Sequence, residues 1–163
     1  MIKLTIARLV RVGLFNIDSM NIFELQRNAN AFNARETGRE VILSSESQAL
    51  IIELQKDQLM QGENMLGEPI EPEYRSFSYA RFKNRINPRA GFGTPDLRYS
   101  GAFYNAFFFD EDDMEVYSRD EKVERLIAKY GAIFGLNDDS VERYRQYFRR
   151  KYLERRIAQL RGR

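Results

Sequence analysis

The stretch Gly91–Phe109, GFGTPDLRYSGAFYNAFFF, joins a glycine-rich turn to the densest aromatic block of the chain. Its first half combines glycine and proline, residues typical of turns. Its second half ends in three consecutive phenylalanines, which favour a β-strand. Because strand side chains alternate between faces, we expect Phe107 and Phe109 on one face and Phe108 on the other. The sequence therefore predicts a turn that leads into a strand with two faces to cover.

A second strand is expected directly after the first. Ala106–Phe109 and Met114–Tyr117 are rich in strand formers, and Asp110–Asp113 between them is polar and turn-prone. The sequence predicts a β-hairpin over about residues 106–117. Upstream, the spacing of apolar residues predicts a helix over Ser19–Phe32. One or two helical turns are expected over Tyr79–Ile86, because Asn87-Pro88 would stop a helix there.

A longer helix is predicted before the glycine-rich stretch. Ser44 or Ser45 is expected to cap its N-terminus, and Gly62 to end it. Its expected apolar face contains Ala49, Ile52 and Leu59.

Two further helices are predicted after the hairpin. The first spans Asp120–Tyr130, with Ser118 and Glu121 as a capping box and Gly131 at its end. The second starts after Asn137 and reaches about Leu160, and Asp138 or Asp139 is expected to cap it. Its predicted apolar stripe contains Val141, Tyr144, Phe148, Tyr152, Ile157 and Leu160.

The fold class that follows is α+β, with a small antiparallel β region packed against about four helices. With 163 residues, the chain fits one globular domain. We expect an N-terminal strand or arm at 1–18, an α+β core domain at 19–136 and a basic amphipathic helix at 137–163.

The composition excludes several functional classes. The chain has no cysteine, which excludes disulfide frameworks and cysteine nucleophiles, and no histidine, the usual general base near neutral pH. We expect no enzyme activity, no cofactor and no metal. Arg8 and Arg11 interrupt the apolar N-terminal segment and no small-residue cleavage site follows, so we expect neither a signal peptide nor a membrane anchor.

Two charged regions have alternative interpretations. The acidic run Asp110–Glu115 is expected to be a solvated turn, and the alternative is a magnesium or calcium site. Between residues 142 and 163, nine Lys or Arg against two acids leave a net charge of +7, in a chain whose total is +2. That helix either presents a solvated basic face or contacts nucleic acid or an acidic partner through Arg149, Arg150, Arg155 and Arg156.

The aromatic residues are candidates for packing or subunit contact, because exposed aromatic patches mark interfaces. The candidates are Tyr104, Phe107, Phe109, Tyr144 and Phe148. We expect Pro95, Asp96 and Gly101 to shape the turn that presents them. Gly91-Phe92-Gly93 lacks the Gly-Lys-Ser/Thr of a phosphate-binding loop and is expected to be a plain turn.

Four segments occur in a fixed order: QLMQGENMLGEPIEPEY, TPDLRYSGAFYNAF, a hairpin ending in VYSRDEK, and LIAKYGAIFGLNDDS. Together they resemble small neck, connector or tail-completion proteins of Bacteroides-type, crAss-like tailed bacteriophages, over about residues 44–140. The resemblance implies a structural virion protein that forms a homo-oligomeric ring and contacts portal, neck or tail proteins. It also implies assembly in the bacterial host cytoplasm and a possible contact with packaged DNA.

Two other hypotheses compete with this one. A nucleic-acid-binding module would use the basic C-terminal helix and would bind DNA in a salt-dependent way. A carboxylate-dependent metalloenzyme would use Asp110–Glu115. Because DNA in the lumen of a ring would also touch basic residues, oligomeric state separates the first two hypotheses better than DNA binding does.

Overall fold

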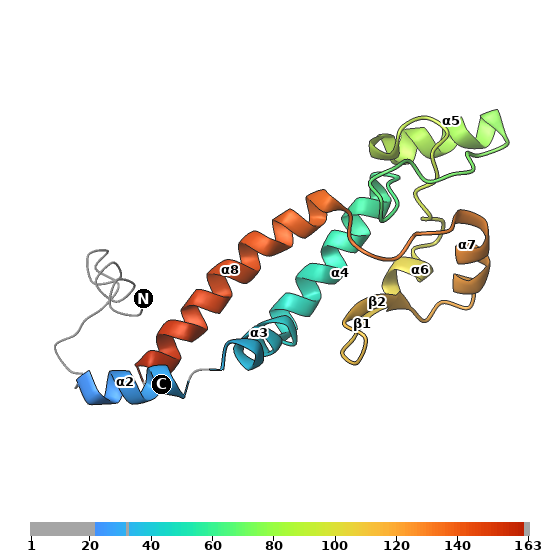
Figure 1. Cartoon of the computed structure of the whole chain (residues 1–163). Helices are drawn as coiled ribbons and strands as arrows, with labels where there is room; N and C mark the ends of the chain where they lie inside the picture. The colour runs from blue at the N-terminus through green and yellow to red at the C-terminus, as the bar shows by residue number, and fades with distance from the viewer. Residues whose placement is uncertain (1–21, 32, 162–163) are drawn as a thin grey trace.

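The computed structural model describes residues 22–31 and 33–161, so the predicted N-terminal arm at 1–18 lies outside the described residues. Two long helices, α4 (Ser45–Met60) and α8 (Asp138–Leu160), lie side by side and form the long axis of the molecule (Figure 1). At one end of this pair, α2 (Ile22–Asn30) and α3 (Ala34–Ile42) pack against α8. The other elements lie beside α4 and beyond its C-terminal end (Figure 1).

This second group of elements contains the predicted hairpin. In chain order it consists of α5 (Phe77–Ile86), the short 3-10 helix η2 (Pro88–Ala90), α6 (Ala102–Asn105), β1 (Phe107–Asp110), β2 (Glu115–Ser118) and α7 (Val123–Tyr130). The described part of the chain is therefore mostly helical, with one two-stranded antiparallel sheet. This confirms the predicted α+β class, although the described residues form seven α-helices where about four were expected. None of the described helices has the length and apolar character needed to cross a membrane.

The hairpin has the predicted position and the predicted alternation of faces. Its register pairs Phe107 with Ser118 and Asp110 with Glu115. Phe107 and Phe109 are buried, and both strands contact α4. Phe108 lies on the other face, where the guanidinium carbon of Arg119 is 4.2 Å from the centre of its ring. The cationic side chain of Arg119 thus covers the face of the hairpin opposite Phe107 and Phe109.

Helix α4 begins and ends as predicted, but its buried face differs from the expected one. The Ser44 hydroxyl accepts a hydrogen bond from the Ser47 amide, and Gly62 follows the helix with a φ of +75°. Leu59 is fully buried as expected, whereas Ala49 is exposed and Ile52 only half-buried. The spacing of apolar residues predicted this face incorrectly, because polar residues also form part of it.

Two buried glutamines on that face attach α4 to the loop before α8. Gln55 donates to the Ile133 carbonyl (3.1 Å) and accepts from the Gly135 amide (2.8 Å). Gln58 donates to the carbonyls of Asn64 and Gly135 (both 3.0 Å) and accepts from the Asn137 amide (2.7 Å). Each side chain therefore satisfies backbone groups that would otherwise be buried without a partner.

Several predicted helix boundaries were wrong. Helix α7 begins at Val123 instead of Asp120, because the Ser118 hydroxyl donates to the Phe103 carbonyl and accepts the Asp120 amide within a turn. The capping box with Glu121 does not form, although Gly131 follows the helix with a positive φ as expected. The cap of α8 is Asn137, whose side chain accepts the Ser140 amide at 2.9 Å. Helices α3 and α6 were not predicted.

The glutamine pair gives a stability prediction. In Gln58→Leu, the Gly135 carbonyl and the Asn137 amide lose their partner while the side-chain volume is nearly kept. We expect the free energy of unfolding to fall by about 3 kcal/mol, the upper end of the cost for orphaned buried polar groups. Chemical denaturation of both proteins measures this loss. Gln146→Leu, on an exposed part of α8, is the control and should change stability by less than about 0.5 kcal/mol. An equally small effect of Gln58→Leu would contradict the assigned role.

Candidate functional site

Helix α5 exposes apolar side chains and buries a charged one, unlike an ordinary surface helix. Its apolar residues Phe77, Phe82 and Ile86 are 70%, 53% and 60% exposed. The residues on its inner side are Ala80 and Lys83, both buried. A buried charge beneath exposed large apolar side chains is the reverse of the usual distribution. Large exposed apolar side chains of this kind are typical of interaction sites.

A buried ion pair holds α5 in this orientation. The Lys83 ammonium lies 2.6 Å from Oδ1 of Asp96, with side-chain exposures of 8% and 2%. Lys83 also donates to the Arg98 carbonyl. Since an unpaired charge in such an environment is strongly unfavourable, α5 must keep this side against the loop that carries Asp96.

Asp96 connects this contact to the rest of the protein. Asn87 donates to Oδ2 of Asp96 (3.1 Å) and to the Met60 carbonyl at the end of α4 (2.8 Å). The Tyr104 hydroxyl donates to the Asp96 carbonyl (2.5 Å), and the Tyr74 hydroxyl lies 3.4 Å from Oδ1. Burial and the nearby Asp96 carboxylate raise the pKa of Tyr74 and Tyr104 well above the ordinary value. Both phenols therefore remain hydrogen-bond donors even at an alkaline pH at which an ordinary tyrosine ionises.

The exposed surface of α5 combines aromatic, aliphatic and basic side chains. We call it the α5 face and define it as Phe77, Arg81, Phe82, Arg85, Ile86 and Phe92. Phe92 comes from the loop before Asp96, and its ring centre lies 5.4 Å from that of Phe77. The two arginines form no ion pair within the described part of the chain. Helix α5 itself contains no acidic residue.

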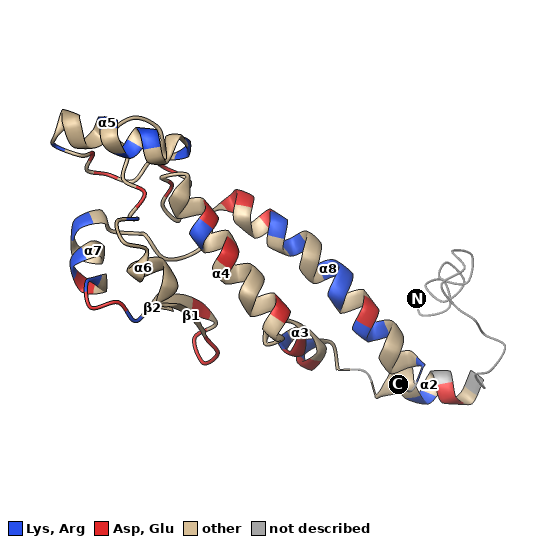
Figure 2. Ribbon diagram, turned by 180° about the vertical axis from the view of Figure 1, so that it is seen from behind, with Lys and Arg blue, Asp and Glu red and all other residues tan. Residues whose placement is uncertain are grey.

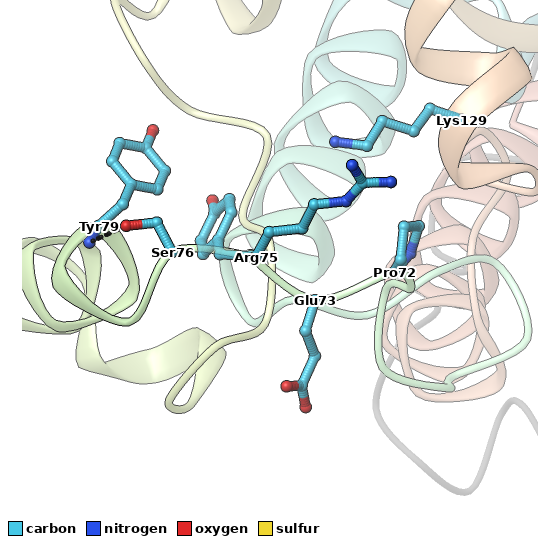
Figure 3. Close-up of a pocket in the computed structure, with 7 residues that line it drawn as sticks. Pro72, Glu73, Arg75, Ser76, Tyr79 and Lys129 are labelled. Atoms are coloured by element: carbon cyan, nitrogen blue, oxygen red, sulfur yellow. Dashed lines mark hydrogen bonds between the residues drawn. The ribbon is translucent and has the colours of Figure 1, made fainter.

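A shallow pocket of about 500 Å³ adjoins this surface, between residues 72–79 and α7 (Figure 3). Arg75 and Lys129 extend into the same space, whereas Glu73 points the opposite way. Lys129 donates to the Tyr130 hydroxyl at 2.9 Å, and Arg75 forms no ion pair with a described residue. Two converging cations without a carboxylate between them favour an anionic partner.

Three of the five aromatic residues that the sequence marks as contact candidates lie inside the molecule, and the other two are half-buried. Tyr104, Phe107 and Phe109 are buried in the chain's own core, and the rings of Tyr104 and Phe107 stack at 5.6 Å. The Tyr144 hydroxyl is 2.6 Å from the Ser47 hydroxyl on α4, and Phe148 lies against α3 at Gly38. Tyr104, Phe107 and Phe109 therefore offer little surface to another subunit, whereas Tyr144 and Phe148 are half-buried and contact α4 and α3.

The three residues expected to shape the turn all lie in or beside the loop that carries the buried carboxylate. Pro95 and Asp96 are buried, and Asp96 is the residue at which the hydrogen bonds of this loop meet. Gly101 precedes α6 with a φ of +87°, a conformation that favours glycine.

The basic charge of α8 is partly neutralised by acids on the neighbouring helices. Arg143 pairs with Asp57 (3.0 Å), Lys151 with Glu46 (2.9 Å) and Arg155 with Glu40 (3.2 Å). Blue bands run along much of α8 in Figure 2, and red bands run along α4 beside it. Hydrogen bonds from Arg89 and Arg143 lower the pKa of Asp57, and the bond from Lys151 lowers the pKa of Glu46. Much of the charge asymmetry therefore stabilises helix packing.

Among the arginines proposed to contact nucleic acid or an acidic partner, Arg155 belongs to this packing. The guanidinium carbon of Arg150 lies 5.8 Å from the centre of the Tyr147 ring. Arg149 is exposed and forms no ion pair with a described residue. Arg156 is half-buried and has a partner of its own.

The acidic hairpin turn has the structure of an ordinary turn. Oδ1 of Asp110 accepts the amides of Asp112 (2.9 Å) and Asp113 (3.2 Å), which fixes the backbone. Glu111 accepts a hydrogen bond from Gln48 at 2.7 Å. Within residues 22–31 and 33–161, no three carboxylates come together in a way that could hold a metal ion.

Comparison of the chain with protein-family models, with curated proteins and with solved structures gave no match. Interpretation of the α5 face therefore depends on its own chemistry.

Replacing Lys83 tests whether the ion pair holds α5 in place. Lys83→Met leaves the buried Asp96 carboxylate without its cation, and we expect a loss of about 3–5 kcal/mol in the free energy of unfolding. Adding Asp96→Asn should recover part of that loss, because the second change removes the orphaned charge. Denaturation of the single and double variants measures the coupling.

The matched control is Arg145→Met, which breaks an exposed ion pair with Glu142. We expect a loss of less than about 1 kcal/mol for this variant. If Lys83→Met were no more costly than Arg145→Met, the buried pair would not be the contact that orients α5.

Proposed function

We propose that this chain is a structural virion protein of a tailed bacteriophage, a ring-forming subunit of the neck, head–tail connector or tail-completion region. The observation that supports this proposal most directly is the orientation of helix α5. The fold uses a buried Lys83–Asp96 pair to direct Phe77, Phe82 and Ile86 to the surface. Such an arrangement has a purpose if another protein covers these side chains.

The energetics favour a protein partner for this surface. Burying a large apolar side chain contributes about 1.5–3 kcal/mol. Phe82 and Ile86 lie one helical turn apart and Phe77 packs against Phe92, so the surface contains two apolar pairs. Clustered aromatic residues with arginine beside them are also the composition of interface hot spots.

The shape of the molecule suits a ring. The α4–α8 pair places the α5 face toward one end of the molecule and α2 with α3 at the other (Figure 1). Closed rings form when one patch of a subunit contacts a different patch of its neighbour. An elongated subunit with distinct ends can present two such patches. The sequence resemblance over about residues 44–140 supports the same role.

In this proposal the chain assembles in the bacterial host cytoplasm and contacts portal, neck or tail proteins of the same virion. It has no catalytic step of its own. Contact with packaged DNA is compatible with a ring, through basic residues that face a lumen. A stand-alone nucleic-acid-binding role is less well supported, because ion pairs with α3 and α4 engage three of the cations of α8.

The test is the oligomeric state of the purified full-length protein. We expect light scattering after size exclusion, together with electron microscopy, to show a ring. Phe82→Ser/Ile86→Ser should shift the protein toward monomers, because it removes apolar area from the interface. Thermal melting should change little, since both side chains are exposed in the monomer.

Leu66→Ser/Leu153→Ser is the matched control, because these leucines are 67% and 52% exposed and lie outside the α5 face. It should leave the oligomer intact. A wild-type protein that stays monomeric at all accessible concentrations, alone and with portal or tail proteins, would contradict the proposal.

A further inference from the structure

We propose that the α5 face of one subunit binds the acidic β1–β2 turn of the next subunit. This inference rests on the proposed ring, and it names the two patches that meet. Two surfaces of opposite charge support it, and neither has an ion-pair partner among the described residues.

The acidic surface is the turn of the hairpin. Between residues 110 and 115 the chain has five carboxylates, and Glu111, Asp112 and Asp113 are exposed. None of the five forms an ion pair with a residue that the structure describes. Their hydrogen bonds involve amides, a tyrosine and a glutamine, which leave the negative charge in place.

The basic surface is the α5 face with its adjoining pocket. Arg81 and Arg85 alternate with Phe82 and Ile86 along one exposed side of α5. Arg75 and Lys129 extend into the pocket next to it (Figure 3). Cationic and apolar side chains are therefore available together on one surface.

The two surfaces cannot satisfy each other within one chain. Figures 1 and 2 both show the hairpin turn, red in Figure 2, well apart from α5. No ion pair between described residues links them. A contact between them must join two copies, and because the patches differ, the contact is heterologous and propagates around a ring.

Helix α8 is a weaker receptor for the acidic turn. Three of its cations already pair with acids of α3 and α4, and its aromatic residues Tyr144 and Phe148 pack against the same helices. The large apolar side chain exposed on α8 is Leu153, whereas the α5 face exposes Phe77, Phe82, Ile86 and Phe92.

Complementary charge reversal tests the contact. Arg81→Glu/Arg85→Glu places acids on both patches, and Asp112→Lys/Asp113→Lys places cations on both. We expect each variant alone to associate roughly tenfold or more weakly than the wild type, because like charges face each other. Mixed in equal amounts, the two variants should assemble again, since the acidic turn of one fits the basic face of the other. Mass photometry of the full-length proteins measures the three samples.

The control is Arg35→Glu/Arg39→Glu, which makes the same change in charge at two exposed positions on α3, outside the α5 face. It should assemble like the wild type. The circular dichroism spectrum of every variant should match that of the wild type. Because misfolded chains would not assemble on mixing, recovery of assembly in the mixture also shows that both variants are folded.

The other outcomes overturn this inference in distinguishable ways. If the wild type assembles and both reversed variants assemble equally well, the contact is wrong while the ring stands. If neither variant assembles and their mixture also fails, the patches do not meet each other. If Arg81→Glu/Arg85→Glu assembles normally but loses salt-dependent binding of fluorescent duplex DNA, the α5 face binds nucleic acid instead. A wild type that never assembles contradicts both the ring and this contact.

Discussion

The ion pair between Lys83 and Asp96 is the interaction on which the arrangement around α5 depends. Asp96 receives hydrogen bonds from side chains of three different segments and, through Asn87, is linked to the end of α4. Because a buried charge must keep its partner, the helix cannot rotate to bury its apolar residues. A local electrostatic constraint thus determines which side of α5 is available to other proteins. The Lys83–Asp96 ion pair therefore determines both the conformation of the loop that carries Asp96 and the composition of the exposed surface of α5.

Charge is distributed over the molecule in two different ways. On α8, three cations face acids on α3 and α4, and the resulting pairs contribute to the packing of the long helices. On the α5 face and on the hairpin turn, charges of opposite sign have no such neighbours among the described residues. Because the positive and negative charges nearly cancel, the net charge of +2 does not reveal that they lie on different surfaces. In the proposed ring, the first set of charges holds one subunit together and the second set joins neighbouring subunits.

The sequence was sufficient to predict elements whose determinants are local. The hairpin followed from its strand formers, and α4 from a serine cap and a terminal glycine. Its buried face was predicted incorrectly, because Gln55 and Gln58 are buried only through hydrogen bonds to a loop about 80 residues away. The α5 face was not predicted because it also depends on a contact with a residue outside the helix. Periodicity alone would turn Phe82 inward, and only the distant Asp96 explains why Lys83 is buried instead.

Site-specific photocrosslinking tests the proposed contact between subunits most directly. A benzophenone amino acid at position 82 would lie within the α5 face, and the assembly would be formed from equal amounts of light and heavy isotope-labelled protein. Mass spectrometry of cross-linked peptides then separates contacts within a chain from contacts between chains. We expect light–heavy cross-links from position 82 to the segment Asp110–Glu115. Cross-links confined to a single chain, or reaching a different surface of the neighbour, would contradict the contact.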